Sequence, residues 1–337
     1  MRSRPALVIL AIALLLPWSW AWASGAASPA VAVAAQPAGI LWVDPGDIRS
    51  RDLFYGPGGK QGQPKEPLTF VKEDQGGTNP KFDVVDAAGT KWKAKLGLEA
   101  RPETAAVRLL WAVGFVTNEN YFLPKVQVEK MPTRLNRGQE LAGAEGLLRS
   151  VRVQRPPESK KVGNWDWKHN PFVGTREFNG LRVMMALLSN WDLRKVNNAI
   201  YADGKKNGPV LYEVSDLGAS FGRNGESYTN AMSKSNLGAY RKAKFVTKVT
   251  PERVSFNFPT HLPYLYIFNA PHFFSQARQH WIGRNIPRAD VKWMGHLLAK
   301  LSHQQICDAF GAAGYSHDQA EAYATVIEAR IKQLEQL

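Results

Sequence analysis

The sequence predicts an α+β protein with two lobes: a small antiparallel-sheet lobe that carries one helix, and a larger, mainly helical lobe. Three short runs typical of strands, separated by turn-forming residues, lie between residues 66 and 96. A helical pattern follows them, and the C-terminal third contains two capping-box sequences that begin helices. We therefore expect an N-lobe at residues 41–130 and a C-lobe at residues 131–337.

The N-lobe strands follow one another closely. Residues 68–71 and 82–85 are short apolar runs, and the Gln-Gly-Gly-Thr-Asn-Pro segment between them has the composition of a turn. Residues 91–96 alternate in polarity, as one strand of a half-buried sheet does. Together the three runs predict an antiparallel meander, and residues 121–128 predict a further strand.

Two helices carry the rest of the predicted core. Pro102 fits the first turn of a helix, and apolar residues recur at helical spacing from Ala106 to Val113. Glu103 lies on the same, inward face of this helix. Residues 175–189 are apolar on almost all sides and therefore predict a buried helix.

The composition is that of a folded, basic protein. Apolar residues make up 44% of the 337 residues and charged residues 21%, which excludes a disordered chain. The net charge of +14 makes an anionic membrane surface or an acidic protein a candidate partner, whereas nucleic acid is disfavoured because no recognised binding motif accompanies the charge. A single cysteine, Cys307, excludes a disulfide framework and a Cys-rich zinc site, and we expect it to be buried and inert. The seven histidines show no metal-binding spacing.

The N-terminus predicts an exported protein. Two arginines among the first four residues precede an apolar run over residues 6–16, and Ala-Trp-Ala at residues 21–23 provides a small-x-small cleavage site. These features predict a signal peptide over residues 1–23 and an Ala/Pro-rich linker over residues 24–40. We expect a periplasmic or extracellular location, with membrane anchoring if the signal peptide is not cleaved.

Two short motifs lie on either side of a predicted β-hairpin. Residues 190–197 read Asn-Trp-Asp-Leu-Arg-Lys-Val-Asn, and residues 216–218 read Asp-Leu-Gly. The first resembles the protein-kinase catalytic loop H-R-D-L-K-x-x-N, and the second resembles the metal-binding motif D-F-G. With the order of elements, these motifs make the chain similar to the protein-kinase-like superfamily over roughly residues 66–225. The resemblance implies a two-lobed kinase-like fold.

The chain departs from typical protein kinases in ways that resemble the atypical branch, which includes phosphoinositide kinases, secreted kinases and bacterial toxin-type kinases. The glycine loop lacks the full G-x-G-x-x-G, Asn-Trp stands where His-Arg is usual, and no A-P-E follows. The resemblance therefore favours the bacterial, atypical kinases of this superfamily.

The resemblance implies that three residues carry the transfer. Asp192 would accept the proton of the attacking hydroxyl, Lys95 would hold the α- and β-phosphates, and Glu103 would orient Lys95. A transferred phosphoryl group carries dispersed negative charge, so such a site supplies cations and positioning rather than a covalent nucleophile.

The resemblance also implies ATP and Mg²⁺ as cofactors. Asn197 and Asp216 would hold the metal through the oxygen ligands that Mg²⁺ prefers. The remaining candidates would contact the nucleotide: Gly76, Gly77, Thr78 and Lys93. Three of the assignments have a rival of the same residue type nearby: Lys93 for Lys95, Glu99 for Glu103 and Asn198 for Asn197.

The predicted function is Mg²⁺-dependent transfer of a phosphoryl group from ATP to a hydroxyl of a protein, lipid or sugar, outside the cytoplasm. The first alternative is a secreted pseudokinase that acts as a binding or scaffold domain, because the glycine loop is altered and ATP is scarce outside cells. A weaker alternative keeps the fold and transfers a nucleotidyl group to a protein.

Overall fold

The computed structural model describes residues 39–76, 79–202, 208–223, 233–257 and 278–337. The predicted signal peptide and most of the predicted linker lie outside these residues, as do Gly77 and Thr78. The last two linker residues form strand β1 (Gly39–Ile40). No helix in the described part of the chain is both long enough and apolar enough to span a membrane.

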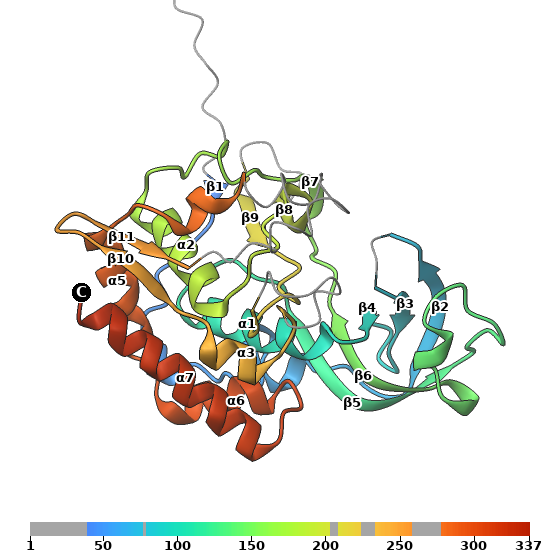
Figure 1. Ribbon diagram of the computed structural model, residues 1–337. Coiled ribbons are helices and arrows are strands. Elements are labelled where there is room, and N and C mark those ends of the chain that lie inside the picture. Colours follow the sequence, from blue (N-terminus) through green and yellow to red (C-terminus); the bar gives the residue numbers. More distant parts are fainter. Residues whose placement is uncertain (1–38, 77–78, 203–207, 224–232, 258–277) are drawn as a thin grey trace, which may run out of the picture. The chain divides into compact units, whose positions relative to one another are not determined.

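The N-lobe is built on a closed barrel with the strand order β2-β3-β4-β6-β5 (Figure 1). Its strands are β2 (Leu68–Asp74), β3 (Lys81–Val85), β4 (Lys91–Leu96), β5 (Asn120–Glu129) and β6 (Leu147–Gln154). Neighbouring strands are antiparallel except β2 and β5, which pair in parallel. The predicted antiparallel meander is confirmed, and the expected alternation in β4 buries Trp92, Ala94 and Leu96, although Lys95 between them is buried too.

The barrel continues past residue 130, where the sequence analysis placed the end of the N-lobe. β6 pairs with both β4 and β5 and so closes the barrel. Two successive residues of β6, Arg149 and Ser150, are exposed, and Ser150 takes a left-handed φ of 54°. This irregularity breaks the alternation by which a strand is found in a sequence.

A carboxylate fixes the turn that leads into β4. Asp86 accepts hydrogen bonds from the backbone N–H groups of Ala88 and Thr90 and from the indole of Trp92. Asp is common in turns because its side chain satisfies backbone donors in this way. β4 is thereby held in register with β3.

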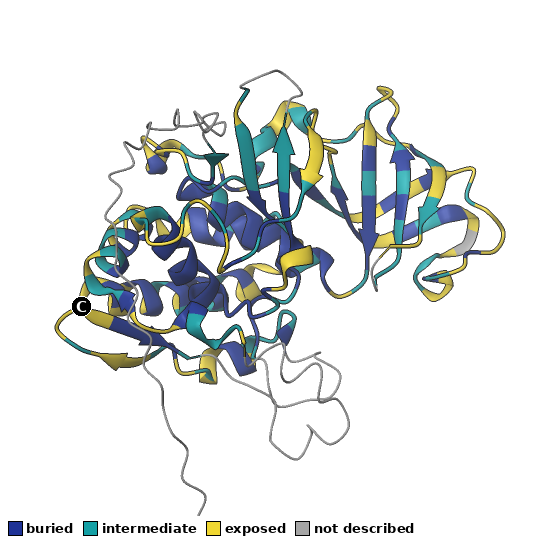
Figure 2. Ribbon diagram, turned by 90° about the horizontal axis from the view of Figure 1, so that it is seen from above, coloured by how far each residue is buried: buried dark blue, intermediate teal, exposed yellow. Residues whose placement is uncertain are grey.

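Two helices of the fold are largely buried. α1 (Ala100–Ala112) follows β4, and Glu103 on it is buried, as predicted. α2 (Arg176–Leu188) is capped by Thr175, whose hydroxyl accepts a hydrogen bond from the Phe178 N–H. Every residue from Phe178 to Leu188 is buried (Figure 2), which confirms the buried helix.

The C-lobe combines the buried helix with two small sheets and further helices. One sheet has the order β1-β9-β8-β7, with β7 (Lys160–Gly163), β8 (Asn198–Ala202) and β9 (Val210–Val214). The other contains β10 (Val246–Val249), β11 (Arg253–Phe256) and β12 (Ile286–Pro287). The helices are α3 (Leu237–Lys242), α5 (Arg288–Leu298), α6 (His303–Gly311) and α7 (His317–Glu335).

The predicted helix starts in the C-terminal third are confirmed. Ser302 and Ser316 each cap a helix in a full capping box, in which the serine and the third helical residue exchange hydrogen bonds. The mixed α+β fold, with an antiparallel-sheet region followed by a largely helical region, is also confirmed.

Candidate active site

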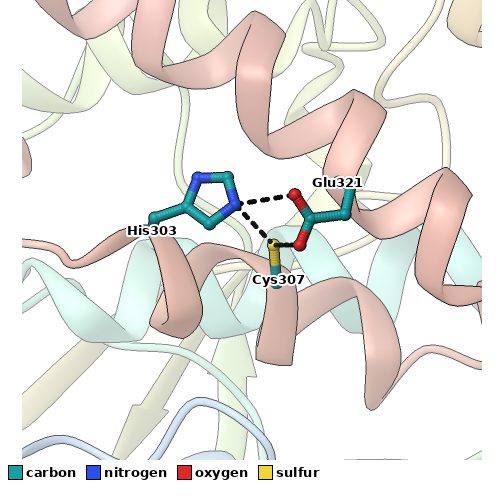
Figure 3. Close-up of side chains that lie close together, drawn as sticks. All are labelled: His303, Cys307 and Glu321. Carbon is teal, nitrogen blue, oxygen red and sulfur yellow. Dashed lines mark hydrogen bonds and ion pairs between the residues drawn. The ribbon is translucent and has the colours of Figure 1, made fainter.

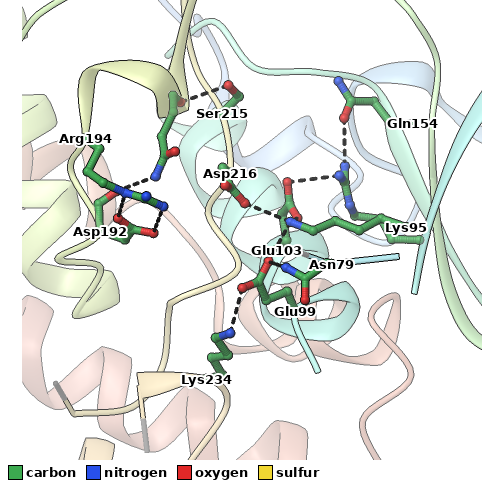
Figure 4. A network of polar contacts seen from close by, with 12 residues as sticks. Asn79, Lys95, Glu99, Glu103, Gln154, Asp192, Arg194, Ser215, Asp216 and Lys234 are labelled. Carbon is green, nitrogen blue, oxygen red and sulfur yellow. Dashed lines mark hydrogen bonds and ion pairs between the residues drawn. The ribbon is translucent and has the colours of Figure 1, made fainter. Parts of the chain in front are cut away.

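Lys95 lies at the centre of a buried ionic network (Figure 4). It is on β4, and 6% of its side chain is exposed. Its ammonium is 3.0 Å from Glu103 Oε2, 2.7 Å from Glu99 Oε2 and 2.8 Å from Asp216 Oδ1. The network therefore joins the barrel, α1 and the loop after β9.

The charges around Lys95 keep it protonated. Burial alone would lower its pKa, but the carboxylates of Glu103, Asp216 and Glu99 outweigh burial, so the pKa is raised. The second oxygen of Glu103 is 3.1 Å from the guanidinium of Arg152, on β6. Glu103 thus bridges two cations, which satisfies a carboxylate that would be costly to bury alone.

Glu99, the predicted rival of Glu103, belongs to the same network. Besides Lys95, it contacts the Lys234 ammonium at 2.8 Å and accepts a hydrogen bond from the Asn79 amide. Burial would raise the pKa of Glu99, but Lys95 and Lys234 lower it to about 2. Both candidate carboxylates therefore contact Lys95, and Glu103 is the more deeply buried of the two.

The loop after α2 holds the second group of candidates. Ser189 caps the C-terminal end of α2 in a left-handed conformation. The Asn190 side chain then accepts a hydrogen bond from the Asp192 N–H. The Asn197 amide donates to the Asp192 carbonyl at 2.8 Å, which closes the loop. The Asp192 carboxylate accepts two hydrogen bonds from Arg194, at 2.6 and 3.0 Å.

Asp216 follows β9 in a left-handed conformation with φ 57°. The preceding residue, Ser215, donates through its N–H and its hydroxyl to the Asn197 carbonyl, so the two loops are tied together. Gly218 lies against Glu99: a Cβ at position 218 would come within 2.5 Å of the Glu99 Cβ. The Asp-Leu-Gly motif thus needs its glycine for close approach to α1.

Several of these side chains face one cavity of about 340 Å³, a size within the range of small-ligand sites, but Asp192, Arg194 and Glu99 are not among its lining residues. It is lined on the N-lobe side by Lys93, Lys95, Glu103 and Arg152, and on the C-lobe side by Asn197, Glu213 and Asp216, among others. The resemblance of the two motifs to those of protein kinases had paired Asn197 with Asp216, and both line the cavity that Lys95 also lines.

The structure also separates the remaining candidates. The Lys93 side chain lines the cavity and is partly exposed. Its ammonium forms ion pairs with Asp74 and Asp83 rather than with Glu103. Asn198, the rival of Asn197, is buried and donates to the Trp165 carbonyl. Gly76 lies in the turn after β2, where its N–H donates to the Asp74 carboxylate.

Glu213 and Arg152 both line the cavity, and neither was predicted from the sequence as a site residue. Glu213, on β9, is 3% exposed, and burial raises its pKa to about 7. A signal for it exists in the sequence, because a glutamate inside the run Val-Leu-Tyr-Glu-Val breaks an otherwise apolar strand. Arg152 had no such signal, because β6 itself was not predicted.

The sequence matches no protein-family model and no curated protein. Among solved structures, a proinflammatory kinase of Helicobacter pylori, CtkA, is similar with a TM-score of 0.44 and 10% identity, over 81% of this chain and 98% of that chain. The Golgi casein kinase is similar with a TM-score of 0.37, and its Mn/ADP-bound form with 0.36, each at 10% identity over 81% of this chain and 73% of that chain. These similarities are distant, so the function of this chain has to be inferred from its own contacts.

Proposed function

We propose that this chain is a phosphotransferase that moves the γ-phosphoryl group of ATP to a hydroxyl acceptor. The observation that supports the proposal best is the convergence of a buried Lys95–Glu103 ion pair with Asn197 and Asp216 on one cavity. A structural ion pair alone would not need an amide and a second carboxylate from a separate loop beside it.

Lys95 is the proposed phosphate ligand. Its ammonium is positioned by two carboxylates of α1, so its location does not depend on the ligand. Lys93 and Lys81 add positive charge to the same cavity. A triphosphate needs cations of this kind, because charge spreads over the phosphoryl oxygens during transfer.

Asn197 and Asp216 are the proposed ligands of Mg²⁺. Their side chains offer an amide oxygen and a carboxylate, and the Asn197 amide nitrogen is already engaged by the Asp192 carbonyl. This donor set fits a hard divalent cation that also binds phosphate and water. When bound, the metal would neutralise charge on the phosphates.

Asp192 is the proposed base for the acceptor hydroxyl. Its carboxylate is 35% exposed, so an acceptor can reach it from solvent. Arg194 holds both oxygens and fixes the orientation of the carboxylate.

The Arg194–Asp192 ion pair also supports the alternative function, a pseudokinase that binds a partner without catalysis. Arg194 occupies both oxygens of Asp192, and Asp216 is paired with Lys95. A protein that never transfers phosphate could keep both pairs permanently.

The acceptor class and the proposed export by the predicted signal peptide are separate questions, and cell fractionation would test the export.

The test is turnover of Mg²⁺-ATP by the purified chain with panels of protein, lipid-vesicle and sugar acceptors. We expect ADP formation and an acceptor mass increased by a phosphoryl group, both lost in Asp192→Asn. The exposed Asp318→Asn is the matched control and should keep wild-type turnover. A mass increased by a nucleotide would instead indicate nucleotidyl transfer, and absence of any turnover in folded protein would favour the pseudokinase.

A further inference from the structure

Three potential metal ligands converge between α6 and α7 (Figure 3), and none of them lines the cavity described above. His303 and Cys307 lie one turn apart on α6, and Glu321 lies on α7. Cys307 Sγ is 3.5 Å from His303 Nε2 and 3.4 Å from Glu321 Oε1, and His303 Nε2 is 2.8 Å from Glu321 Oε2. The imidazole, thiol and carboxylate therefore form a compact triangle.

We propose that His303, Cys307 and Glu321 bind a divalent transition-metal ion of the zinc type, with water at the fourth position. These residues supply nitrogen, sulfur and oxygen, which is a donor set that Zn²⁺ accepts. Three protein ligands plus one water is a known coordination pattern for this ion.

The distances suit a tetrahedral ion. Zn–S bonds of about 2.3 Å and Zn–N bonds of about 2.0 Å at a tetrahedral angle place sulfur and nitrogen roughly 3.5 Å apart. The Cys307–His303 and Cys307–Glu321 distances are already 3.5 and 3.4 Å. His303 contacts the other carboxylate oxygen, Glu321 Oε2, so metal binding would require the carboxylate to turn until one oxygen faces both His303 and Cys307, and the hydrogen-bonded His303–Glu321 pair to open by about 0.5 Å.

A further carboxylate contacts the other ring nitrogen of the His303 imidazole. His303 Nδ1 is 2.9 Å from Glu328 Oε1, so each ring nitrogen faces a carboxylate. A neutral imidazole has one N–H, so it can donate a hydrogen bond to only one of these two carboxylates. With a metal on Nε2, the Nδ1–H would donate to Glu328, which is the usual arrangement around a metal-bound histidine.

The local charge also favours a cation. The chain as a whole carries +14, yet two glutamates lie against His303 at this site. Cys307 is buried at the base of the triangle, while His303 and Glu321 are about 40% exposed, so an ion can enter from solvent. Binding would release the thiol proton, because the ligand form of cysteine is the thiolate.

The metal-free explanation is a protonated His303 between two glutamates. Hydrogen bonds to Glu321 and Glu328 raise the pKa of His303, which favours its charged form. That explanation gives Cys307 no role beyond a weak hydrogen bond. The two explanations therefore differ in whether Cys307 contributes to metal affinity.

The test is titration of the chain, free of any purification tag, with Zn²⁺ by calorimetry and with Co²⁺ by absorption spectroscopy. We expect one Zn²⁺ per chain and a thiolate-to-cobalt charge-transfer band. Cys307→Ser should abolish the band and weaken Zn²⁺ binding by at least about 100-fold, and Glu328→Gln should weaken it by about 10–100-fold. His296→Ala, an exposed histidine on α5, is the matched control and should bind like the wild type.

Two results would overturn the proposal: no Zn²⁺ binding by the folded wild-type chain, or equal affinity in wild type and Cys307→Ser. Circular dichroism would show whether each variant folds. If Cys307→Ser does not fold, Glu321→Gln takes its place, because Glu321 is at the surface and its replacement leaves the core intact. Unchanged Zn²⁺ affinity in Glu321→Gln would then reject the site.

Discussion

Two clusters in this chain place a basic side chain between carboxylates, and they differ in burial. In the cavity, Lys95 lies between Glu99, Glu103 and Asp216, with 6% of its side chain exposed. Between α6 and α7, His303 lies between two glutamates with 44% of its side chain exposed.

The difference in burial changes what each cluster can do. A buried charge that loses its partner has no water to replace it, so the Lys95 network is a fixed part of the fold. An exposed pair contributes little to stability, and its imidazole can exchange a proton for a metal. The buried cluster suits positioning of a ligand, and the exposed cluster suits reversible binding of an ion.

The largest expected effect is on catalysis at the cavity. Asp192→Asn should lower kcat by about 10²–10⁴-fold, because it removes the proposed general base while keeping the size of the side chain. Nucleotide affinity should change little, since the phosphate and metal ligands remain. Steady-state kinetics with direct ATP-binding measurements separate the two effects, and undiminished kcat would reject the proposed role.

The second prediction compares the two clusters in stability. Lys95→Met removes the buried cation and leaves three carboxylates facing one another, so the free energy of unfolding should fall by about 3–5 kcal/mol. Urea denaturation with a metal chelator present measures this loss. A loss below about 1 kcal/mol, the range of exposed pairs, would mean that burial does not separate the two clusters.

The third prediction concerns Glu213 and pH. Burial raises its pKa from 4.5 to about 7, so the folded protein keeps a proton that the unfolded chain releases. The stability from this group is present below about pH 4.5 and is lost as pH rises through about 7, by on the order of 3 kcal/mol. Glu213→Gln should flatten the wild-type decline in stability between about pH 4.5 and 7, the range in which the unfolded chain has released this proton and the folded protein still holds it. Equal slopes in both proteins would contradict the buried, raised-pKa carboxyl.

The smallest expected effect is at the exposed cluster without metal. His303→Ala should reduce the free energy of unfolding by less than about 1 kcal/mol in chelator, because its partners remain hydrated. Zn²⁺ should then raise the melting temperature of the wild type and leave that of His303→Ala unchanged. A large loss in chelator would show that this pair is as structural as the one at Lys95.

Much of the fold follows from local sequence patterns. The meander, the buried α2 and the two capping boxes depend on short-range periodicity or on residues three apart, so the sequence contains them directly. β6 was missed because Ser150 interrupts its alternation. The barrel extends past residue 130, to the end of β6.

The candidate sites, like the fold, could be predicted only in part from the sequence. Asp192, Asn197 and Asp216 were proposed through the resemblance of two short motifs to those of protein kinases, and Lys95 and Glu103 through the strand and helix that the same resemblance implies. Which lysine contacts Glu103, and that Glu99 joins it, depends on tertiary packing of α1 against β4.

The cluster between α6 and α7 illustrates the point further. His303 and Cys307 are four residues apart, a spacing that places both on one helix face, yet the sequence analysis saw no metal spacing among the histidines. The third ligand, Glu321, lies on another helix, and no short motif links it to the first two. Only the packing of α6 on α7 brings the three together.

The central claim is that the cavity binds a metal–nucleotide complex, and calorimetry of Mg²⁺-ATP binding to the wild type and to Asp216→Asn tests it most directly. We predict Mg²⁺-dependent binding by the wild type and its loss in Asp216→Asn, because Asp216 is the carboxylate assigned to the metal. Absence of binding by folded wild-type protein, or equal binding by both proteins, would contradict the account.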